Sequence, residues 1–408
     1  MSIGFISKIR IRQYVTLGLI TVLSFGMGTS LLSHIIPSSA IPQNLPIIGT
    51  KYAYYQAHKD DYNTLFFGSS RIYHHIDPAT FDTVTQRANI VTHSFNFGVA
   101  GLKPLHNYAL LQEILKNPPK NLKWVFIEDA LDQGSAPLDE VRTDRAIYWH
   151  TRGNTIYSLR FVLSHPDTSL SQKVTYSLSH LLPFIYHTIN LGRVFDQWLP
   201  MHHLSEEDRA IAAQFLTRAG YRPIDFDMPK RQYFLSNLEQ YTKEVDQLAK
   251  KKKRITYQEP LPPVALSHLQ NIVTTVTEAG ATPIFVVAPT TIYQETIHRA
   301  YHQQHIARLL SFNDPNQYPQ LFDTDSRTDW DHLTPESAEV FTQLLAEKFV
   351  QTTELTVAET NPSSKRKNIP EKTSAKKVKR DSAHSPTQTS SSLRDKATST
   401  PPDTAPKS

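Results

Sequence analysis

The sequence predicts an α/β domain built on a doubly wound parallel sheet of about five strands, with a helical insertion and an N-terminal transmembrane helix. Three observations favour this fold class. Short, mostly apolar runs recur along the chain, segments of helical periodicity separate them, and glycine with small polar residues follows two of them. Such runs are typical of parallel strands buried on both faces, and their alternation with helices is typical of doubly wound sheets.

The N-terminal segment predicts a membrane anchor. Lys8, Arg10 and Arg12 precede an uncharged run at 14–36 that is rich in Leu, Ile, Val, Phe and Gly. Its length suits a transmembrane helix, and basic residues stay on the cytoplasmic side. We therefore expect residues 1–13 in the cytoplasm, a signal anchor at 14–36 and a spacer at 37–59. A cleaved signal peptide is the alternative, because Ser38 and Ala40 resemble a cleavage site.

The α/β pattern occupies residues 60–137 and 260–352. The predicted strands are four clear apolar runs and one weaker run, at 64–67, 94–97, 124–127, 283–288 and 321–323. Apolar periodicity predicts helices at 105–116 and at 266–279, the second ending at Gly280. The last helix begins with Thr334 as N-cap and Pro335 in its first turn. This succession favours a flavodoxin-like sheet.

Residues 138–259 interrupt the pattern as a mostly helical insertion between the third and fourth strands. Its apolar clusters at 157–163 and 181–191 are too apolar to lie free in water. We expect them to cover the carboxyl ends of the strands or to dock on a membrane surface. Residues 353–408 are rich in Ser, Thr, Pro and Lys, which predicts a disordered basic tail.

Charge and cysteine content exclude several classes of function. The formal net charge is +5, but residues 361–408 alone carry eleven Lys and Arg against four Asp and Glu. The remainder is close to neutral, so we expect no nucleic-acid partner. There is no cysteine, which excludes disulfides, thiol catalysis and cysteine-ligated metals. We expect no cofactor and no metal ion, since the acidic string at 323–331 lacks the glycine and glutamate of an EF-hand loop.

Three short segments carry the candidate chemistry, in a fixed order along the chain. Gly68-Ser69-Ser70-Arg71 follows the first strand, and a nucleophilic serine needs such an exposed turn at a strand's carboxyl end. The second strand leads into Asn96-Phe97-Gly98-Val99-Ala100-Gly101, whose glycines leave amides open to an oxyanion. Asp329-Trp330-Asp331-His332 precedes the last helix and supplies a base and an acid that orients it. Each segment alone is more often an ordinary turn.

Taken together, the segments resemble the SGNH (GDSL-like) hydrolase superfamily over roughly residues 60–135 and 262–350. The resemblance implies Ser70 as the nucleophile, with Ser69 in place of the family's aspartate. It also implies His332 as the base and Asp329 as the orienting acid. The amides of Gly101 and Ser70 would donate to the oxyanion. Asp331 and Ser69 are the rival acid and the rival serine.

The third strand departs from the family pattern. The family places an oxyanion-donating asparagine there, whereas this chain has Glu128 and Asp129. Two carboxylates beside an oxyanion would repel it. The whole pattern resembles the membrane-tethered branch that includes DltD-like and alginate O-acetylation (AlgJ/AlgX-like) proteins, which share Gly-Ser-Ser near an N-terminal anchor.

Four further residues are weaker candidates. Arg71 and Asp129 are candidates for substrate binding, and Arg71 could instead pair with an acid. His74 and His75 follow Ser70 closely enough to reach the same pocket, but an exposed helical turn is the simpler interpretation.

The resemblance implies a serine esterase or O-acyltransferase that acts on an envelope polysaccharide or another acylated polymer. The chain would be a single-pass protein of a bacterial inner membrane, with its domain in the periplasm and a membrane-bound O-acyltransferase as partner. The alternative is a catalytically weak protein of the same fold that binds such a polymer or partner. A third hypothesis, delivery into host cells, has only the basic tail in its favour.

Overall fold

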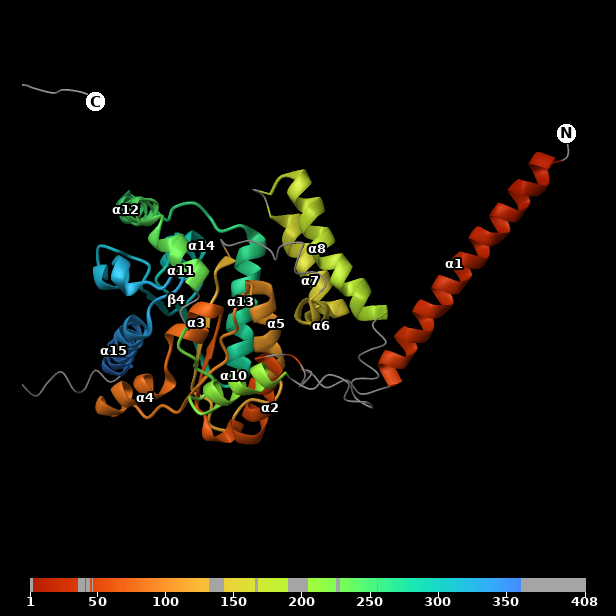
Figure 1. The fold of residues 1–408 in the computed structure, drawn as a ribbon. Helices are drawn as coiled ribbons and strands as arrows, with labels where there is room; N and C mark the ends of the chain where they lie inside the picture. The colour runs from red at the N-terminus through yellow and green to blue at the C-terminus, as the bar shows by residue number, and fades with distance from the viewer. Residues whose placement is uncertain are drawn as a thin grey trace, which may run out of the picture. The chain divides into compact units, whose positions relative to one another are not determined.

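The computed structural model describes residues 3–35, 41, 45, 47–131, 143–165, 168–189, 205–224, 228–254 and 256–360. A five-stranded, fully parallel sheet forms its centre (Figure 1). The strands are β1 (Thr64–Phe67), β2 (Ser94–Asn96), β3 (Trp124–Glu128), β4 (Thr282–Val287) and β5 (Leu309–Ser311). Their order is β2-β1-β3-β4-β5, a common order of doubly wound sheets. The predicted fold class is confirmed at this level.

Helices cover both faces of the sheet. They include α2 (Ile48–His58), α3 (Ser70–His75), α4 (Pro78–Arg87), α5 (Pro104–Leu115), α13 (Pro263–Glu278), α14 (Glu295–His302) and α15 (Pro335–Thr360). Successive strand residues point to opposite faces. Leu65 and Phe67 therefore pack with α5 and α13, whereas Phe66 packs with α4 and α15. Two buried cores result, and each excludes water from one face of the sheet.

The fifth strand was predicted at the wrong place. Residues 321–323 form no strand, because Pro319–Leu321 is a 3₁₀ helix and the amide of Phe322 donates to the carbonyl of Pro319. Leu321 and Phe322 are nevertheless buried in the core. The apolar run therefore reflected the burial of these side chains and not a β-strand. The actual β5 has only three residues at the sheet edge, too few for a periodic signal.

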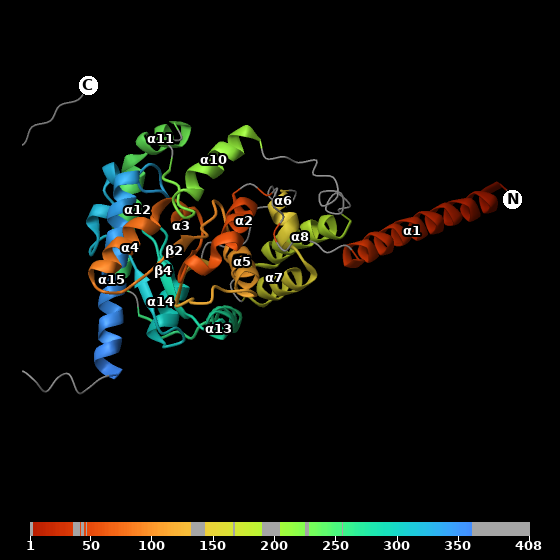
Figure 2. The same cartoon turned by 90° about the horizontal axis from the view of Figure 1, so that it is seen from below.

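The insertion is helical where it is described, and it forms two groups. The first group is α6 (Asp144–Trp149), α7 (Arg152–Ser164) and α8 (Leu170–Ile189). The second group is α10 (Glu206–Leu216), α11 (Met228–Leu235) and α12 (Leu238–Arg254). Helix α7 packs against α5 and α13, and α8 packs on α7 (Figures 1 and 2). The first group therefore covers a helix layer and not the carboxyl edge of the sheet.

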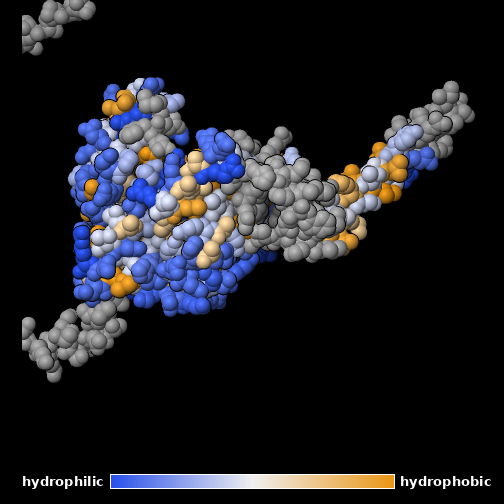
Figure 3. Space-filling view, turned by 60° about the horizontal axis from the view of Figure 1, so that its bottom comes forward, coloured by the Kyte–Doolittle hydropathy of each residue, from blue (hydrophilic) through white to orange (hydrophobic). Residues whose placement is uncertain are grey.

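The two chain ends differ from the sequence expectations. Helix α1 (Ile3–Ile35) occupies the segment of the expected anchor. Figure 3 shows apolar residues along its surface. Within the described residues, however, no helix is long and apolar enough to cross a membrane. Helix α15 continues to Thr360, past the expected domain end at 352. The rest of the predicted tail, 361–408, lies outside the described residues.

Candidate active site

The candidate nucleophile stands on a sharp turn between β1 and α3. Ser69 is the N-cap of α3, and its hydroxyl accepts the amide N–H of Arg71 at 3.3 Å. Ser70 is therefore the first helical residue. A side chain at Gly68 would collide with Ile72 and Glu128, at 2.3 Å and 2.7 Å from an added Cβ. Glycine thus permits the close approach that this turn requires.

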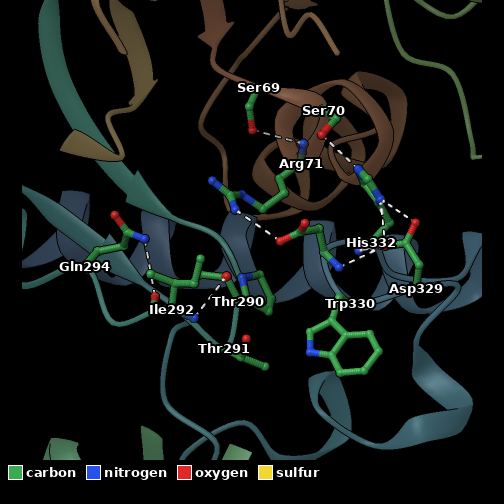
Figure 4. A network of polar contacts seen from close by, with 12 residues as sticks. Ser69, Ser70, Arg71, Thr290, Thr291, Ile292, Gln294, Asp329, Trp330 and His332 are labelled. Carbon is green, nitrogen blue, oxygen red and sulfur yellow. Dashed lines mark hydrogen bonds and ion pairs between the residues drawn. The ribbon is translucent and has the colours of Figure 1, made fainter. Parts of the chain in front are cut away.

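The structure brings Ser70, His332 and Asp329 into one line of hydrogen bonds (Figure 4). The Oγ of Ser70 lies 2.8 Å from Nε2 of His332. The Nδ1 of His332 lies 2.9 Å from each carboxylate oxygen of Asp329. When Nδ1–H donates to the carboxylate, Nε2 is left to accept the serine hydroxyl proton. This is the geometry of a base ready to activate an alcohol nucleophile.

The loop that carries His332 is held by its own hydrogen bonds. The Thr328 amide donates to the His332 carbonyl at 2.9 Å, and the Asp331 and His332 amides donate to Asp329 Oδ1 at 2.9 Å and 3.0 Å. Burial alone would raise the pKa of Asp329, but the bonds from His332 and these amides outweigh it, so the pKa is lowered. Asp329 therefore carries its charge at neutral pH.

The rival residues have other partners. Ser69 donates through its amide and hydroxyl to Oε2 of Glu128, at 2.8 Å and 2.6 Å. Asp331 has a side chain that is 55% exposed and lies 3.8 Å from Nη1 of Arg71. The imidazole of His332 thus faces Ser70 and Asp329 rather than these two residues (Figure 4).

The two carboxylates at the end of β3 are both paired. Arg71 Nε donates to Glu128 Oε1 at 2.6 Å, and both side chains are 5% exposed. Burial would raise the pKa of Glu128, yet Arg71 and Ser69 lower it on balance. Asp129 lies 2.9 Å from Nε2 of His268, whose Nδ1 lies 2.6 Å from the Tyr157 hydroxyl. Arg71 and Asp129, both candidates for substrate binding, are therefore held in buried pairs.

His75 is buried and His74 is half-buried, contrary to the expectation of an exposed turn. The Nε2 of His75 accepts the Leu333 amide at 3.0 Å, which ties the His332 loop to α3. His74 Nδ1 donates to the Arg222 carbonyl at 2.8 Å. Burial lowers the pKa of His74 to about 3 and lowers that of His75 as well. Both rings are therefore neutral at neutral pH. They lie beside Ser70, His332 and Asp329, which are called the triad below.

The second motif forms the turn after β2. Gly101 is exposed and has φ +69°, a left-handed conformation that favours glycine. The Gly98 amide donates to the Asn96 side chain at 2.8 Å. The buried Lys51 donates to the carbonyls of Asn96 and Gly98 at 2.9 Å and 2.7 Å. This lysine fixes the turn. The oxyanion role of the Gly101 amide stays a prediction.

The second group of insertion helices borders the triad. Phe215 of α10 packs edge-on against Tyr73 of α3, with ring centroids 6.1 Å apart. Tyr233 and Phe234 of α11 pack against Trp330, and Arg231 donates to the backbone of the His332 loop. The insertion therefore shapes the surroundings of the triad through α10 and α11 and not through its most apolar clusters.

Sequence reasoning missed Lys51, Glu128 as a partner of Arg71, and His268. Each pairing joins segments far apart in the chain, so no local spacing could have signalled it. No protein-family model matches this chain, and no curated protein matches it either.

Proposed function

We propose that this protein is a serine esterase or O-acyltransferase that works through an acyl-enzyme on Ser70. The observation that carries the proposal is the line of hydrogen bonds from Ser70 through His332 to Asp329. A serine hydroxyl is a weak nucleophile until a base removes its proton, and an imidazole with an orienting carboxylate is suited to that task. The order of motifs and the parallel sheet support membership of the SGNH class.

The reaction follows from these positions. Ser70 Oγ attacks the ester carbonyl carbon while His332 Nε2 takes the hydroxyl proton, and the carbonyl oxygen becomes an oxyanion. The amides of Gly101 and Ser70 are the proposed donors to that oxyanion. When the C–O bond of the ester breaks, His332 returns the proton to the leaving alcohol. Water then releases the acyl group in an esterase, and a second alcohol accepts it in a transferase.

The proposed substrate is an acylated envelope polysaccharide or similar polymer, and the proposed setting is the periplasmic side of a bacterial inner membrane. Apolar residues of α1 that are more than half exposed, such as Leu17, Val22 and Met27, support attachment there. A membrane-bound O-acyltransferase is the proposed donor of acyl groups. A reporter active only in the periplasm, fused after Thr352, tests the location. Activity of a cytoplasmic reporter at that position would contradict it.

One observation favours the alternative of a catalytically weak polymer-binding protein. The end of β3 offers Glu128 and Asp129 where the SGNH class has an oxyanion-donating asparagine. Loss of one such donor costs on the order of 10²- to 10³-fold in rate. The esterase proposal therefore predicts a slow catalyst.

A fluorophosphonate probe separates the two functions, because it labels only an activated serine. We expect labelling of the full chain at Ser70. Ser70→Ala and His332→Ala should abolish it, and Ser69→Ala, the matched control one residue away, should retain it. Equal labelling of the chain and of Ser70→Ala would exclude the enzyme, and binding of the polymer without turnover would then favour the alternative.

A further inference from the structure

The outer face of helix α8 is apolar and its side chains remain exposed, although α1 also contacts α8. Six large apolar side chains, between 36% and 80% exposed, lie at helical spacing on this face: Leu170, Val174, Leu178, Leu181, Leu182 and Ile185. The buried face carries Ser179 and His180, only 3% and 2% exposed. A helix that borders water normally buries its apolar face and exposes its polar one. The six exposed apolar side chains of α8 depart from this arrangement, so its outer face suits a surrounding other than water.

Polar contacts fix this orientation of α8. His180 Nδ1 lies 2.9 Å from Nε2 of His150, the C-cap residue of α6. Lys173 donates to the carbonyl of Leu163 at 2.8 Å, which joins the two helices of the hairpin. His187 Nδ1 donates to the carbonyl of Ile147 at 2.9 Å. A rotation that buried the leucines would break all three contacts, so the apolar face is held outward.

Helix α7, which packs against α8, also exposes apolar side chains. Its Ile156 and Leu163 are 42% and 56% exposed, while its opposite side packs on α5 and α13. Neither α7 nor α8 contains an Asp or Glu, and both α7 arginines, Arg152 and Arg160, are exposed. A helical hairpin that exposes apolar and basic side chains, with no acidic residue in either helix, matches the chemistry of an anionic lipid surface, with acyl chains below negatively charged headgroups.

We propose that the α7–α8 hairpin docks on an anionic phospholipid bilayer, with the outer face of α8 at the boundary between headgroups and acyl chains. Burying the apolar face there removes it from water, and the basic side chains remain among the phosphates. The proposal goes beyond the esterase function and is independent of Ser70 chemistry. It gives the domain a fixed orientation on the membrane, because α7 is packed on the helix layer of the sheet.

The absence of cysteine from the chain permits a direct test. Leu178→Cys and Leu182→Cys, made in the full chain, each take one environment-sensitive fluorophore. Gln240→Cys, exposed on α12, is the control. On vesicles of phosphatidylcholine and phosphatidylglycerol we expect a blue shift at 178 and 182, with quenching by nitroxide-labelled lipids. The label at 240 should stay in water.

Each other outcome overturns the proposal. Labels at 178 and 182 that remain in water on vesicle-bound protein would show that the hairpin does not dock. Labels shielded from water but not quenched by nitroxide lipids would show that protein, such as a second copy or a partner, covers the face. Equal quenching on phosphatidylcholine alone would overturn the role of anionic lipid.

A matched pair of charge substitutions gives a second test. Leu178 of α8 and Val340 of α15 are 44% and 40% exposed, so a glutamate at either position reaches solvent at similar cost. With the fluorophore at an Ile185→Cys position, Leu178→Glu should reduce nitroxide quenching several-fold, and Val340→Glu should not. Equal effects of the two substitutions would overturn the proposal. The melting temperature of each variant monitors the fold, and fluorophosphonate labelling of Ser70 monitors the active site.

Discussion

Among the described residues, two histidine–aspartate pairs share a separation of 2.9 Å but lie in very different surroundings. In the first, His332 lies 2.9 Å from Asp329, and the two side chains are 15% and 12% exposed. In the second, His268 lies 2.9 Å from Asp129, and the side chains are 0% and 1% exposed. The Nε2 atom of His332 meets the hydroxyl of Ser70, whereas Nδ1 of His268 meets the hydroxyl of the half-buried Tyr157.

The comparison shows that a charge-assisted pair does not by itself make an active site. A base must also have a nucleophile within reach and a substrate path to it. His332 lies on a partly exposed loop at the carboxyl edge of the sheet, next to the turn that presents Ser70. His268 lies inside the layer formed by α13, α5 and α7, where it joins three segments of the chain. We therefore assign catalysis to the first pair and stability to the second.

The largest expected effect is the loss of the base. His332→Ala should lower the turnover of an aryl ester on the order of 10⁴-fold or more, because Ser70 then has no proton acceptor. His268→Ala should lower the melting temperature but leave turnover per folded molecule within a few-fold. Ester hydrolysis and thermal unfolding, measured on both variants, check this. Comparable activity losses in the two folded variants would contradict the assignment.

The acid of the first pair should matter nearly as much. Asp329→Asn should lower turnover about 10³- to 10⁴-fold, because an amide no longer favours the tautomer of His332 that accepts the serine proton. Asp331→Asn is the matched control on the same loop, and its mostly exposed carboxylate makes a small contribution. Steady-state kinetics of both variants decide between the acids. Greater loss in Asp331→Asn would exchange their roles.

The buried pair beside the nucleophile should dominate stability near the site. Glu128→Gln leaves the Arg71 guanidinium buried without its countercharge, which costs about 3–5 kcal/mol of unfolding free energy. Glu113→Gln, which breaks an ion pair with the exposed Lys116, should cost about 0–1 kcal/mol. Urea unfolding measures both. Equal losses would show that Arg71 finds another partner.

The second histidine pair should contribute less than Glu128 but more than a surface contact. Asp129→Asn weakens the bond to His268 without removing the shape of the side chain, and we expect a loss of about 1–3 kcal/mol. Fluorophosphonate labelling of Ser70 should proceed at the unaltered rate in the folded protein. A strong fall in the labelling rate would mean that Asp129 acts in the active site after all.

The last effect is absent at neutral pH and grows as the pH falls. Folding lowers the pKa of His74 to about 3 through burial, so the unfolded chain binds this proton more readily than the folded one. Stability should therefore fall as pH drops below about 6.5, by up to about 1.4 kcal/mol for each pH unit per histidine. Melting temperatures between pH 7 and 4 should decline less steeply in His74→Asn. An unchanged slope would contradict a lowered pKa of His74 in the folded chain.

Local patterns predicted much of the frame. The strands β1 to β4 lie within one residue of the predicted runs, and α5, α13 and the start of α15 lie within three residues of theirs. These elements could be predicted because burial on both faces gives continuous apolar runs and helices give a periodic apolar pattern, both within neighbouring residues. Ser70, His332 and Asp329 could be predicted for a related reason. Each lies in a short local motif where a strand or loop leads into a helix.

The sequence by itself determined the parallel α/β pattern, the nucleophile turn and the acidic loop with its histidine. Only the tertiary structure decided which side chains meet. Ser70 and His332 lie 262 residues apart in the chain, and Arg71 and Glu128 lie 57 apart. Residue spacing carries no information on such contacts, because the sheet order brings β1, β3 and the loop before α15 to the same edge. For that reason the pairing of Glu128 with Arg71 and of Asp129 with His268 emerged only from the folded chain. The same holds for the burial of His75 and for the outward apolar face of α8.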